Sequence, residues 1–293
     1  MYPAPFEYVT ASSWEEAVQE LTRHGEDARV LAGGQSLVPM MSLRLAKPSA
    51  LVDVNHAAEA RIEGSNGTVE ISALTRHAQL ERSEILATAC PLLPEAAAMI
   101  GNVRVRHRGT IGGSLAHADP AGELPCVAVA TGATVHALGP GGERTIAADE
   151  LFQSYFTTAL EPGEIITGLS VSAFPPGRGS AFVELARRAG DFASVMVAVI
   201  VDVDETGERW TGLRGALGSV SDRPVDVGGL LRTFAGEPAG AGAAAEAARQ
   251  VAESVEARDD ERASAPYRRR MIEVLMARAL ETATARARST RES

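Results

Sequence analysis

Two glycine pairs, set far apart in the chain, constrain the fold more than any other feature of this sequence. One lies in residues 32–36 (Ala-Gly-Gly-Gln-Ser) and the other in residues 110–114 (Thr-Ile-Gly-Gly-Ser). Because glycine has no Cβ, its backbone adopts positive φ readily and can approach a ligand closely. A turn whose N–H groups point the same way forms an anion site. Two such turns that meet in space predict a site for a ligand with two phosphates.

Each glycine pair taken alone also fits a simpler role, as a tight corner between a strand and a helix. Neither pair matches the G-x-G-x-x-G pattern of dinucleotide-binding Rossmann domains, and no Gly-Lys-Ser/Thr follows a glycine loop as in a P-loop. The G-x-S-x-G elbow of serine hydrolases is absent as well. The polar neighbours Gln35, Ser36, Thr110 and Ser114 favour the ligand-binding interpretation.

Composition and charge limit the class of protein. The chain has 293 residues, of which 45% are hydrophobic, and a formal net charge of −10, which does not favour nucleic-acid binding. Its two cysteines, Cys90 and Cys126, lie among apolar residues, so we interpret them as core residues of a cytoplasmic protein without a disulfide framework. We expect no signal peptide, because the start of the chain has no charged n-region and no apolar h-region. We expect no transmembrane helix, because no run reaches about 18 apolar residues.

Hydrophobic patterning predicts mixed helices and strands, with boundaries at the turn-rich residues 63–67 and 174–179. The strands are expected at residues 28–31, 50–54, 68–73, 134–138, 164–171, 181–187, 194–203 and 209–217. The first helix is expected to begin at Ser12 or Ser13. Further helices are expected at residues 75–80, 94–100, 123–131, 243–257 and about 264–287.

Three polar groups have both a structural and a functional interpretation. The basic run of residues 104–108 is a solvated edge, a phosphate contact or a docking surface for a partner. His117 and Asp119 are reminiscent of a metal-binding fragment, but no second histidine stands at ligand spacing, so no metal site is predicted. Glu123 begins an apolar helix, where its carboxylate either interacts with the helix dipole or accepts hydrogen bonds from sugar hydroxyls.

Two long segments resemble the flavin-binding segments of the medium subunits of molybdenum hydroxylases. The first covers residues 31–39 and continues through 43–48 and 51–55, and the second covers residues 110–120 and 123–125. Residues 265–269 are similar to the start of the C-terminal helix in that family. The similarity spans nearly the whole chain in the right order, and the family includes aerobic carbon monoxide dehydrogenase and xanthine and nicotine dehydrogenases.

The resemblance implies an α+β fold in three units with FAD between them. Residues 1–57 and 58–175 would form two α+β subdomains of a FAD-binding domain, and residues 176–293 a C-terminal domain with a three-stranded antiparallel sheet and helices. The cofactor-binding residues that it implies are Leu31, Ala32, Gly33, Gly34, Gln35, Ser36, Leu37, Ile100, Thr110, Ile111, Gly112, Gly113, Ser114, Glu123, Ile165, Ile166 and Phe192.

The implied roles differ along this set. The two glycine segments would bind the diphosphate, Ile100 would lie against the adenine or the ring system, and Ile165 or Ile166 would line the flavin ring. Glu123 replaces an aspartate of the relatives, and Phe192 replaces a tyrosine that lies over the flavin face in some of them. Phenylalanine still stacks on the ring but cannot donate a hydrogen bond. Ser114 stands where many relatives have asparagine.

By the same resemblance, the chain is the FAD-carrying subunit of a molybdenum-containing dehydrogenase and has no catalytic acid–base residue. Its expected partners are an iron–sulfur small subunit that supplies electrons and a large subunit whose molybdenum cofactor oxidises the substrate, assembled as a dimer of heterotrimers. The flavin would pass the electrons to an external acceptor. Two alternatives remain: a stand-alone FAD oxidase, a class that often binds flavin covalently, and a non-enzymatic nucleotide-binding assembly module.

Overall fold

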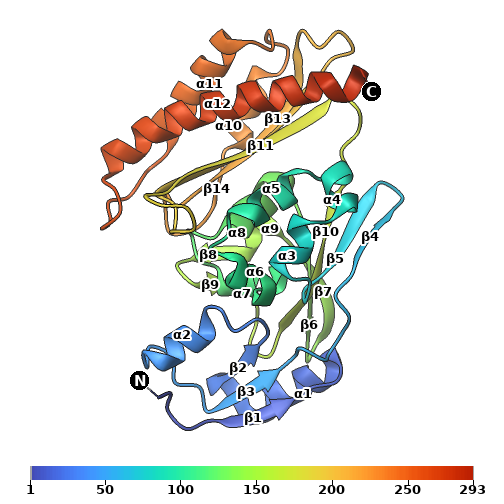
Figure 1. The fold of residues 1–293 in the computed structure, drawn as a ribbon, viewed down its shortest axis with the longest axis vertical. Helices are drawn as coiled ribbons and strands as arrows, with labels where there is room; N and C mark the ends of the chain where they lie inside the picture. The colour runs from blue at the N-terminus through green and yellow to red at the C-terminus, as the bar shows by residue number, and fades with distance from the viewer. Residues whose placement is uncertain (1, 293) are drawn as a thin grey trace.

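Three sheet-containing parts follow one another along the long axis of the molecule (Figure 1). The computed structural model describes residues 2–292. The N-terminal part forms one end, the central part lies in the middle, and the C-terminal part with its long helix forms the other end. The predicted α+β class is confirmed.

The N-terminal part is a parallel three-stranded sheet with the strand order β1-β3-β2. Ser13 begins its first helix by accepting a hydrogen bond from the amide of Glu16 at 3.1 Å, as the sequence predicts. The sequence pattern misses β1, because this strand is largely exposed and has no apolar run. The elements are β1 (Glu7–Thr10), α1 (Trp14–His24), the 3₁₀ turn η1 (Gly25–Asp27), β2 (Ala28–Leu31), α2 (Leu37–Ser42) and β3 (Ala50–Asp53).

The central part is an antiparallel sheet with the order β4-β5-β10-β6-β7, combined with short helices and the small pair β8-β9. Its strands are β4 (Ile62–Ser65), β5 (Thr68–Ser72), β6 (Thr134–Gly139), β7 (Gly142–Ala147), β8 (Phe152–Ser154), β9 (Thr157–Thr158) and β10 (Ile165–Ser172). Its helices are α3 (His77–Glu81), α4 (Glu84–Ala89), α5 (Leu92–Met99), α6 (Val103–Arg108), α7 (Ile111–His117), α8 (Glu123–Thr131) and α9 (Ala148–Leu151).

Two expectations for the central part are wrong. Residues 63–67 are not a boundary but belong to the β4–β5 hairpin, in which Asn66 and Gly67 have φ angles of 51° and 78° and form the two-residue turn. The second glycine pair is not an open turn, because Gly112 and Gly113 lie in the first turn of α7. A glycine pair in the sequence therefore does not by itself distinguish a turn from the start of a closely packed helix.

The C-terminal part contains the three predicted antiparallel strands, and a two-residue strand, β14, extends the sheet. Asp204 and Gly207 close the predicted turn between the second and third strands through a 3.0 Å backbone hydrogen bond. The elements are β11 (Arg178–Leu185), β12 (Val195–Val203), β13 (Trp210–Gly218), β14 (Val225–Asp226), α10 (Gly228–Leu231), the 3₁₀ turn η2 (Arg232–Phe234), α11 (Ala241–Ser254) and α12 (Ala265–Glu292).

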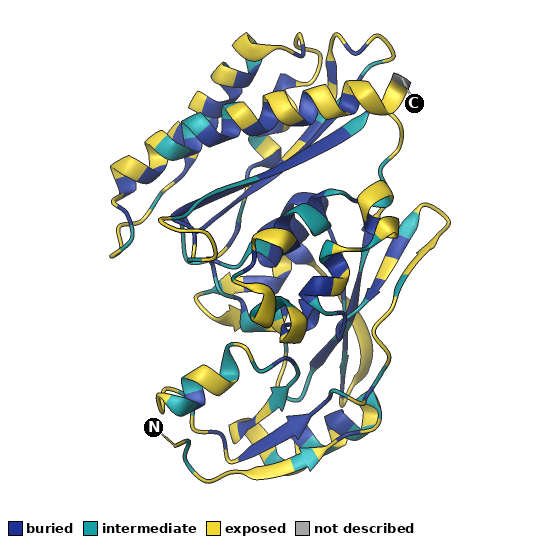
Figure 2. Ribbon diagram, in the orientation of Figure 1, coloured by how far each residue is buried: buried dark blue, intermediate teal, exposed yellow. Residues whose placement is uncertain are grey.

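Strand β12 joins the C-terminal part to the central part, because both of its faces are buried. The odd-numbered valines from Val195 to Val201 pack into a core with α11 and α12, whereas Met196, Ala198 and Ile200 belong to the core of the central part. Figure 2 shows this sheet as dark blue strands between the long helix and the central helices. A strand buried on both faces reads as a continuous apolar run. Because β12 packs against the central part, the loop between β11 and β12 also lies beside that part, with Gly190 next to Gly101.

Candidate functional site

A cavity of about 670 Å³ opens where the three parts meet. Its volume lies within the range of roughly 300–1,000 Å³ that is typical of small-molecule and cofactor sites. The cavity wall includes residues 29–37 of the N-terminal part, the start of α7 in the central part, and Gly190–Phe192 of the C-terminal part. No single part therefore contains the whole site.

The residues that the resemblance assigns to the cofactor surround this cavity, with one exception. Ile111 is absent from the cavity wall formed by residues 2–292, because its side chain is buried in the core of the central part and only 1% exposed. The others line the wall: Leu31, Ala32, Gly33, Gly34, Gln35, Ser36, Leu37, Ile100, Thr110, Gly112, Gly113, Ser114, Glu123, Ile165, Ile166 and Phe192.

The first glycine segment leaves β2 and enters α2 with its main-chain amides available. Within residues 2–292, the N–H groups of Gly33 through Ser36 have no protein acceptor. Gly34 has a φ of 70°, a conformation that favours glycine. The side-chain amide of Gln35 donates to the carbonyl oxygen of Gly33 at 3.0 Å and so fixes the turn. A run of unpaired N–H groups on a cavity wall is suited to an anion.

The second glycine segment differs, because its amides are already bonded. Gly112 donates to the carbonyl oxygen of Ala73 at 2.9 Å, and Gly113 donates to Oγ1 of Thr110 at 3.1 Å. A Cβ added to Gly112 would lie 2.5 Å from the Cβ of Ala73, so glycine is needed here for close packing. The expectation that both segments present unpaired amides is therefore wrong for the second one.

The two segments nevertheless meet, as the sequence predicts. A Cβ added to Gly33 would lie 2.3 Å from the carbonyl oxygen of Arg108 and 2.8 Å from Cα of Gly109. The backbone at Gly33 thus packs directly on the chain that leads into α7. Only glycine permits this approach without a shift of the backbone.

The apolar wall of the cavity comes from three regions. Ile100 ends α5, and Ile165 and Ile166 begin β10; all three side chains are buried. Phe192, in contrast, is exposed to solvent, because 60% of its surface is accessible. An exposed aromatic ring beside a cavity is available to a ligand.

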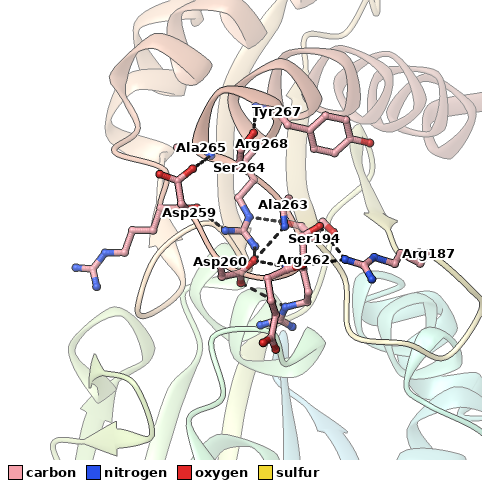
Figure 3. Close-up of polar contacts among 12 residues, drawn as sticks. Arg187, Ser194, Asp259, Asp260, Arg262, Ala263, Ser264, Ala265, Tyr267 and Arg268 are labelled. Carbon is pink, nitrogen blue, oxygen red and sulfur yellow. Dashed lines mark hydrogen bonds and ion pairs between the residues drawn. The ribbon is translucent and has the colours of Figure 1, made fainter.

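Loop 186–194, which carries Phe192, is fastened at its base to the segment before α12. Arg268, which is 1% exposed, donates from Nε to the carbonyl oxygen of Ser194 at 3.0 Å and from Nη2 to Asp260 at 2.7 Å (Figure 3). Its Nη1 donates to the carbonyl oxygen of Arg258. Arg268 belongs to the segment that resembles the family's C-terminal helix.

Two further arginines connect the same loop to this segment. Arg187 donates from Nη2 to the carbonyl oxygen of Glu261 at 2.9 Å (Figure 3). The guanidinium of Arg262 lies 5.9 Å from the ring centroid of Phe192, within the range of a cation–π contact. The C-terminal part therefore sets the position of the aromatic ring at the cavity.

Two carboxyl groups near the cavity have strongly perturbed pKa values. Glu123, the first residue of α8, is half-buried, and burial raises the pKa of its carboxyl to about 8, with repulsion from Glu184 and Asp119 acting in the same direction. Burial also raises the pKa of Glu184 to about 7, and its Oε2 has no partner within the described residues. At neutral pH the Glu123 carboxyl is mostly protonated, so it can both donate to and accept from a ligand hydroxyl.

His77, which the sequence analysis did not single out, supports the second glycine segment. Its Nε2 lies 3.1 Å from the carbonyl oxygen of Thr110 and 3.0 Å from Oγ of Ser114. Because a carbonyl oxygen only accepts, Nε2 carries the proton. Burial lowers the pKa of the ring to about 4, so the imidazole is neutral. No pattern around His77 distinguishes it from an ordinary buried histidine.

The basic run lies on α6, where Val105 lines the cavity but the basic side chains do not. Within residues 2–292, the side chains of Arg104, Arg106 and Arg108 line no part of the cavity wall. Arg106 donates to Glu81 at 2.9 Å and to the carbonyl oxygen of Ile100 at 3.0 Å. A direct phosphate contact from this run is therefore not supported by the geometry.

The remaining residues considered from the sequence have clear positions. His117 and Asp119 both line the cavity, and the ring of His117 packs against Phe156 with centroids 5.1 Å apart. Cys90 and Cys126 are buried thiols in the core, as predicted. Burial raises the pKa of Cys90 to about 12, which makes it inert.

Two family models match this chain over most of its length. The FAD-binding domain in molybdopterin dehydrogenase matches residues 4–173, and the CO dehydrogenase flavoprotein C-terminal domain matches residues 180–283. The chain belongs to this flavoprotein family. The resemblance drawn from the two glycine segments is thus confirmed, and FAD is the cofactor.

Individual relatives extend over the full chain. The 6-hydroxypseudooxynicotine dehydrogenase complex subunit alpha of Paenarthrobacter nicotinovorans is 43% identical over 298 residues, which cover 100% of this chain and 99% of the relative. The carbon monoxide dehydrogenase medium chain of Hydrogenophaga pseudoflava is 39% identical over 292 residues, covering 98% and 99%.

Solved structures show the same fold. Carbon monoxide dehydrogenase from Hydrogenophaga pseudoflava, in a form that lacks the Mo-pyranopterin moiety, superposes with a TM-score of 0.94 at 37% identity, covering 98% of this chain and 99% of the other. Quinoline 2-oxidoreductase from Pseudomonas putida 86 gives a TM-score of 0.92 at 33% identity, with coverage of 98% and 99%. The chain is a medium, FAD-carrying oxidoreductase subunit of the molybdenum hydroxylases. No helix in residues 2–292 is long and apolar enough to cross a membrane.

Proposed function

We propose that FAD lies in the cavity with its pyrophosphate on the amides of Gly33 through Ser36. The run of N–H groups without a protein acceptor supports this most strongly, because a bound pyrophosphate would satisfy them. Because Gly33 packs closely against Arg108, this anion site would lie beside the start of α7. The surroundings of the phosphates and adjoining atoms would be completed by Ala32, Leu37, the α7 cap Thr110, and Gly112 and Ser114 of α7.

The isoalloxazine and adenine rings require apolar walls, which the cavity supplies. Ile165 or Ile166 would line the flavin ring, Ile100 would lie against the adenine or the ring system, and Phe192 would stack from the C-terminal part. Glu123 would hydrogen-bond to hydroxyl groups of the cofactor. We also propose that the domain boundaries are those expected from the resemblance, at residues 57/58 and 175/176.

When bound, FAD supplies the redox chemistry, and this chain binds and orients it. We propose that an iron–sulfur small subunit delivers electrons to the flavin and that a large subunit with a molybdenum cofactor oxidises the substrate. An external acceptor would then take up the electrons that leave the complex through this subunit. We propose that no side chain of this subunit acts as an acid or base in this electron transfer.

The assembly proposed is a dimer of heterotrimers in the cytoplasm. Its support is the full-length similarity to a dehydrogenase complex subunit and to carbon monoxide dehydrogenase medium chains. Both cysteines are buried thiols, which suits a reducing compartment. The exposed side chains of Arg104 and Arg108 on α6 are then available for contact with a partner subunit.

Purification of the complex from its native cell tests this function. The expected result is three subunits and an absorbance spectrum with overlapping flavin and iron–sulfur contributions, both bleached when the substrate of the large subunit is added. A single-chain flavoprotein that is reduced directly by its own substrate would instead identify a stand-alone oxidase. A preparation without flavin, even after incubation with FAD, would identify an assembly module.

A further inference from the structure

The end of β3 carries a polar group that reaches the first glycine segment. Oδ1 of Asp53 accepts hydrogen bonds from the backbone N–H of Asn55 at 2.8 Å and from its Nδ2 at 2.6 Å. The same Nδ2 donates to the carbonyl oxygen of Ala32 at 2.9 Å. Tyr8 on the neighbouring strand donates to the other carboxylate oxygen of Asp53 at 2.5 Å. Asn55 is thus held rigidly against the residue that precedes Gly33.

Arg76 continues this network to the second glycine segment. Its Nη2 donates to Oδ1 of Asn55 at 2.7 Å, and its Nη1 donates to the carbonyl oxygen of Arg108 at 2.6 Å. This is the same carbonyl oxygen against which the backbone of Gly33 packs. One guanidinium therefore connects the N-terminal part to the chain that enters α7.

The side chain of Arg76 is itself fixed in place. Its backbone N–H donates to Oε1 of Gln79 at 2.8 Å, and its backbone pairs with Thr110 in an isolated antiparallel bridge. The residue is half-buried, and among the described residues it does not belong to the wall of the cavity. Arg76 therefore acts on a ligand only through the two segments that it connects.

We propose that Arg76 is a positioning residue for FAD, which fixes the spacing between the two glycine segments through Asn55 and the Arg108 carbonyl. The planar guanidinium presents two N–H groups in a fixed fork, so it can satisfy both acceptors at once. Without this bridge, the position of the N-terminal part relative to the central part becomes fixed only when FAD binds. That ordering weakens binding, because preorganisation is lost.

This inference rests on the proposed FAD site, and its test separates the two. Arg76→Lys and Arg76→Gln are compared with Arg61→Gln as a control. The Arg61 side chain is 64% exposed, and its one polar contact among residues 2–292 is a 3.7 Å ion pair with Glu63. Each variant is purified in its complex, and FAD dissociation is followed by the recovery of flavin fluorescence in solution. The thermal midpoint of the FAD-depleted complex is measured in parallel.

Both Arg76 variants are expected to weaken FAD binding by about 10- to 100-fold, since a lost charge-assisted hydrogen bond changes an equilibrium by roughly that factor. Arg61→Gln is expected to match the wild type. Lysine keeps the positive charge but is a point donor on a flexible stem, so it does not restore the bridge. The thermal midpoint of the FAD-depleted complex is expected to change far less than the affinity implies.

Wild-type affinity in Arg76→Lys would overturn the proposal, because charge alone would then account for the residue. A loss of FAD that is matched by an equal loss of stability in the depleted complex would also overturn it, as a purely structural role. In either case the FAD site itself stands. A wild-type complex that binds no FAD would reject the proposed function together with this inference.

A double-mutant cycle gives an independent check. Asn55→Ala removes one of the two acceptors of the Arg76 guanidinium and so breaks the bridge. The double variant Asn55→Ala with Arg76→Gln is therefore expected to bind FAD about as weakly as the weaker single variant. Independent effects would instead multiply, as they do for residues that do not share an interaction. Multiplicative losses would contradict a common bridge.

Discussion

Nε2 of His77 lies 3.0 Å from Oγ of Ser114, so a buried, neutral imidazole on α3 holds the first turn of α7. The same nitrogen donates to the carbonyl oxygen of Thr110, the residue that caps α7. Since the amides of Gly112 and Gly113 are bonded within the protein, the position of α7 depends on such contacts rather than on a ligand. The second glycine segment is a rigid support for the first.

The pH dependence of folding should reveal His77. Its pKa is about 4 in the folded chain and 6.5 in the unfolded chain, so the unfolded state binds the proton first as the pH falls. The stabilising contribution is complete above pH 6.5 and is lost toward pH 4. Between pH 7 and pH 5 it should fall by about 2 kcal/mol.

His77→Gln is the matched variant, because glutamine keeps a neutral donor for Thr110 but does not titrate. The quantity to compare is the difference in unfolding free energy between wild type and variant, from urea denaturation at pH 7 and pH 5. Parallel pH profiles for the two proteins would show that His77 is not the buried neutral group described above.

Glu123 should act in the opposite sense. Its pKa of about 8 lies above the ordinary value of 4.5, so the folded state holds a proton that the unfolded state has released. Its contribution to stability is complete below pH 4.5 and is lost as the pH rises through 8. In the absence of FAD, Glu123→Gln should therefore be more stable than wild type at pH 8 by more than about 1 kcal/mol and nearly equal at pH 4.5.

Thermal or urea unfolding of the FAD-free subunit complex at these two pH values measures the effect. Glu150→Gln serves as the control, because this glutamate is exposed on α9. A Glu123→Gln variant that is less stable than wild type at pH 8 would mean that the carboxylate is ionised and stabilising there.

Phe192→Ala should change the reactivity of the flavin more than its retention. The ring is 60% exposed and is held from the C-terminal part, so its loss opens one face of the flavin to solvent while the pyrophosphate site remains. The rate of flavin reoxidation and the FAD content per subunit are the two readouts, with Tyr267→Ala as a control at another exposed aromatic residue. Equal losses in both readouts would argue against a selective role.

The flavin should be bound without a covalent bond. Neither glycine segment contains a histidine or cysteine, and both cysteines are buried away from the solvent. Precipitation with acid should leave the yellow colour in the supernatant. Colour that stays in the pellet, and disappears from it in His117→Asn, would identify His117 as a covalent attachment site and favour the oxidase alternative.

Helix α8 shows what the sequence predicts well. Residues 123–131 form an apolar run, and the observed helix has these bounds because Gly132 adopts a φ of 63° immediately after it. The sequence also predicts the long strand β12 well, since residues 195–201 are all apolar and lie on two buried faces. Where local sequence and packing agree, the boundaries follow from the pattern.

The contacts between the three parts of the molecule could not be predicted from the local sequence pattern. The glycine pairs indicated a shared site, but the pattern could not show that Gly33 packs on the Arg108 carbonyl or that Arg76 bridges to Asn55. These contacts join residues that are far apart in sequence, and arginine has no local signature for such a role. The same holds for Gly112, whose glycine is required by Ala73 rather than by a turn.

Gly33→Ala tests the central claim most directly, with Gly141→Ala as the control because a Cβ at Gly141 meets nothing within 4 Å. The measurement is the FAD content and FAD affinity of the purified complex. The added methyl group must displace the backbone at Arg108 and Gly109, so Gly33→Ala should lose at least about 10-fold in affinity while Gly141→Ala keeps one FAD per subunit. Full FAD content and unchanged affinity in Gly33→Ala would contradict the account.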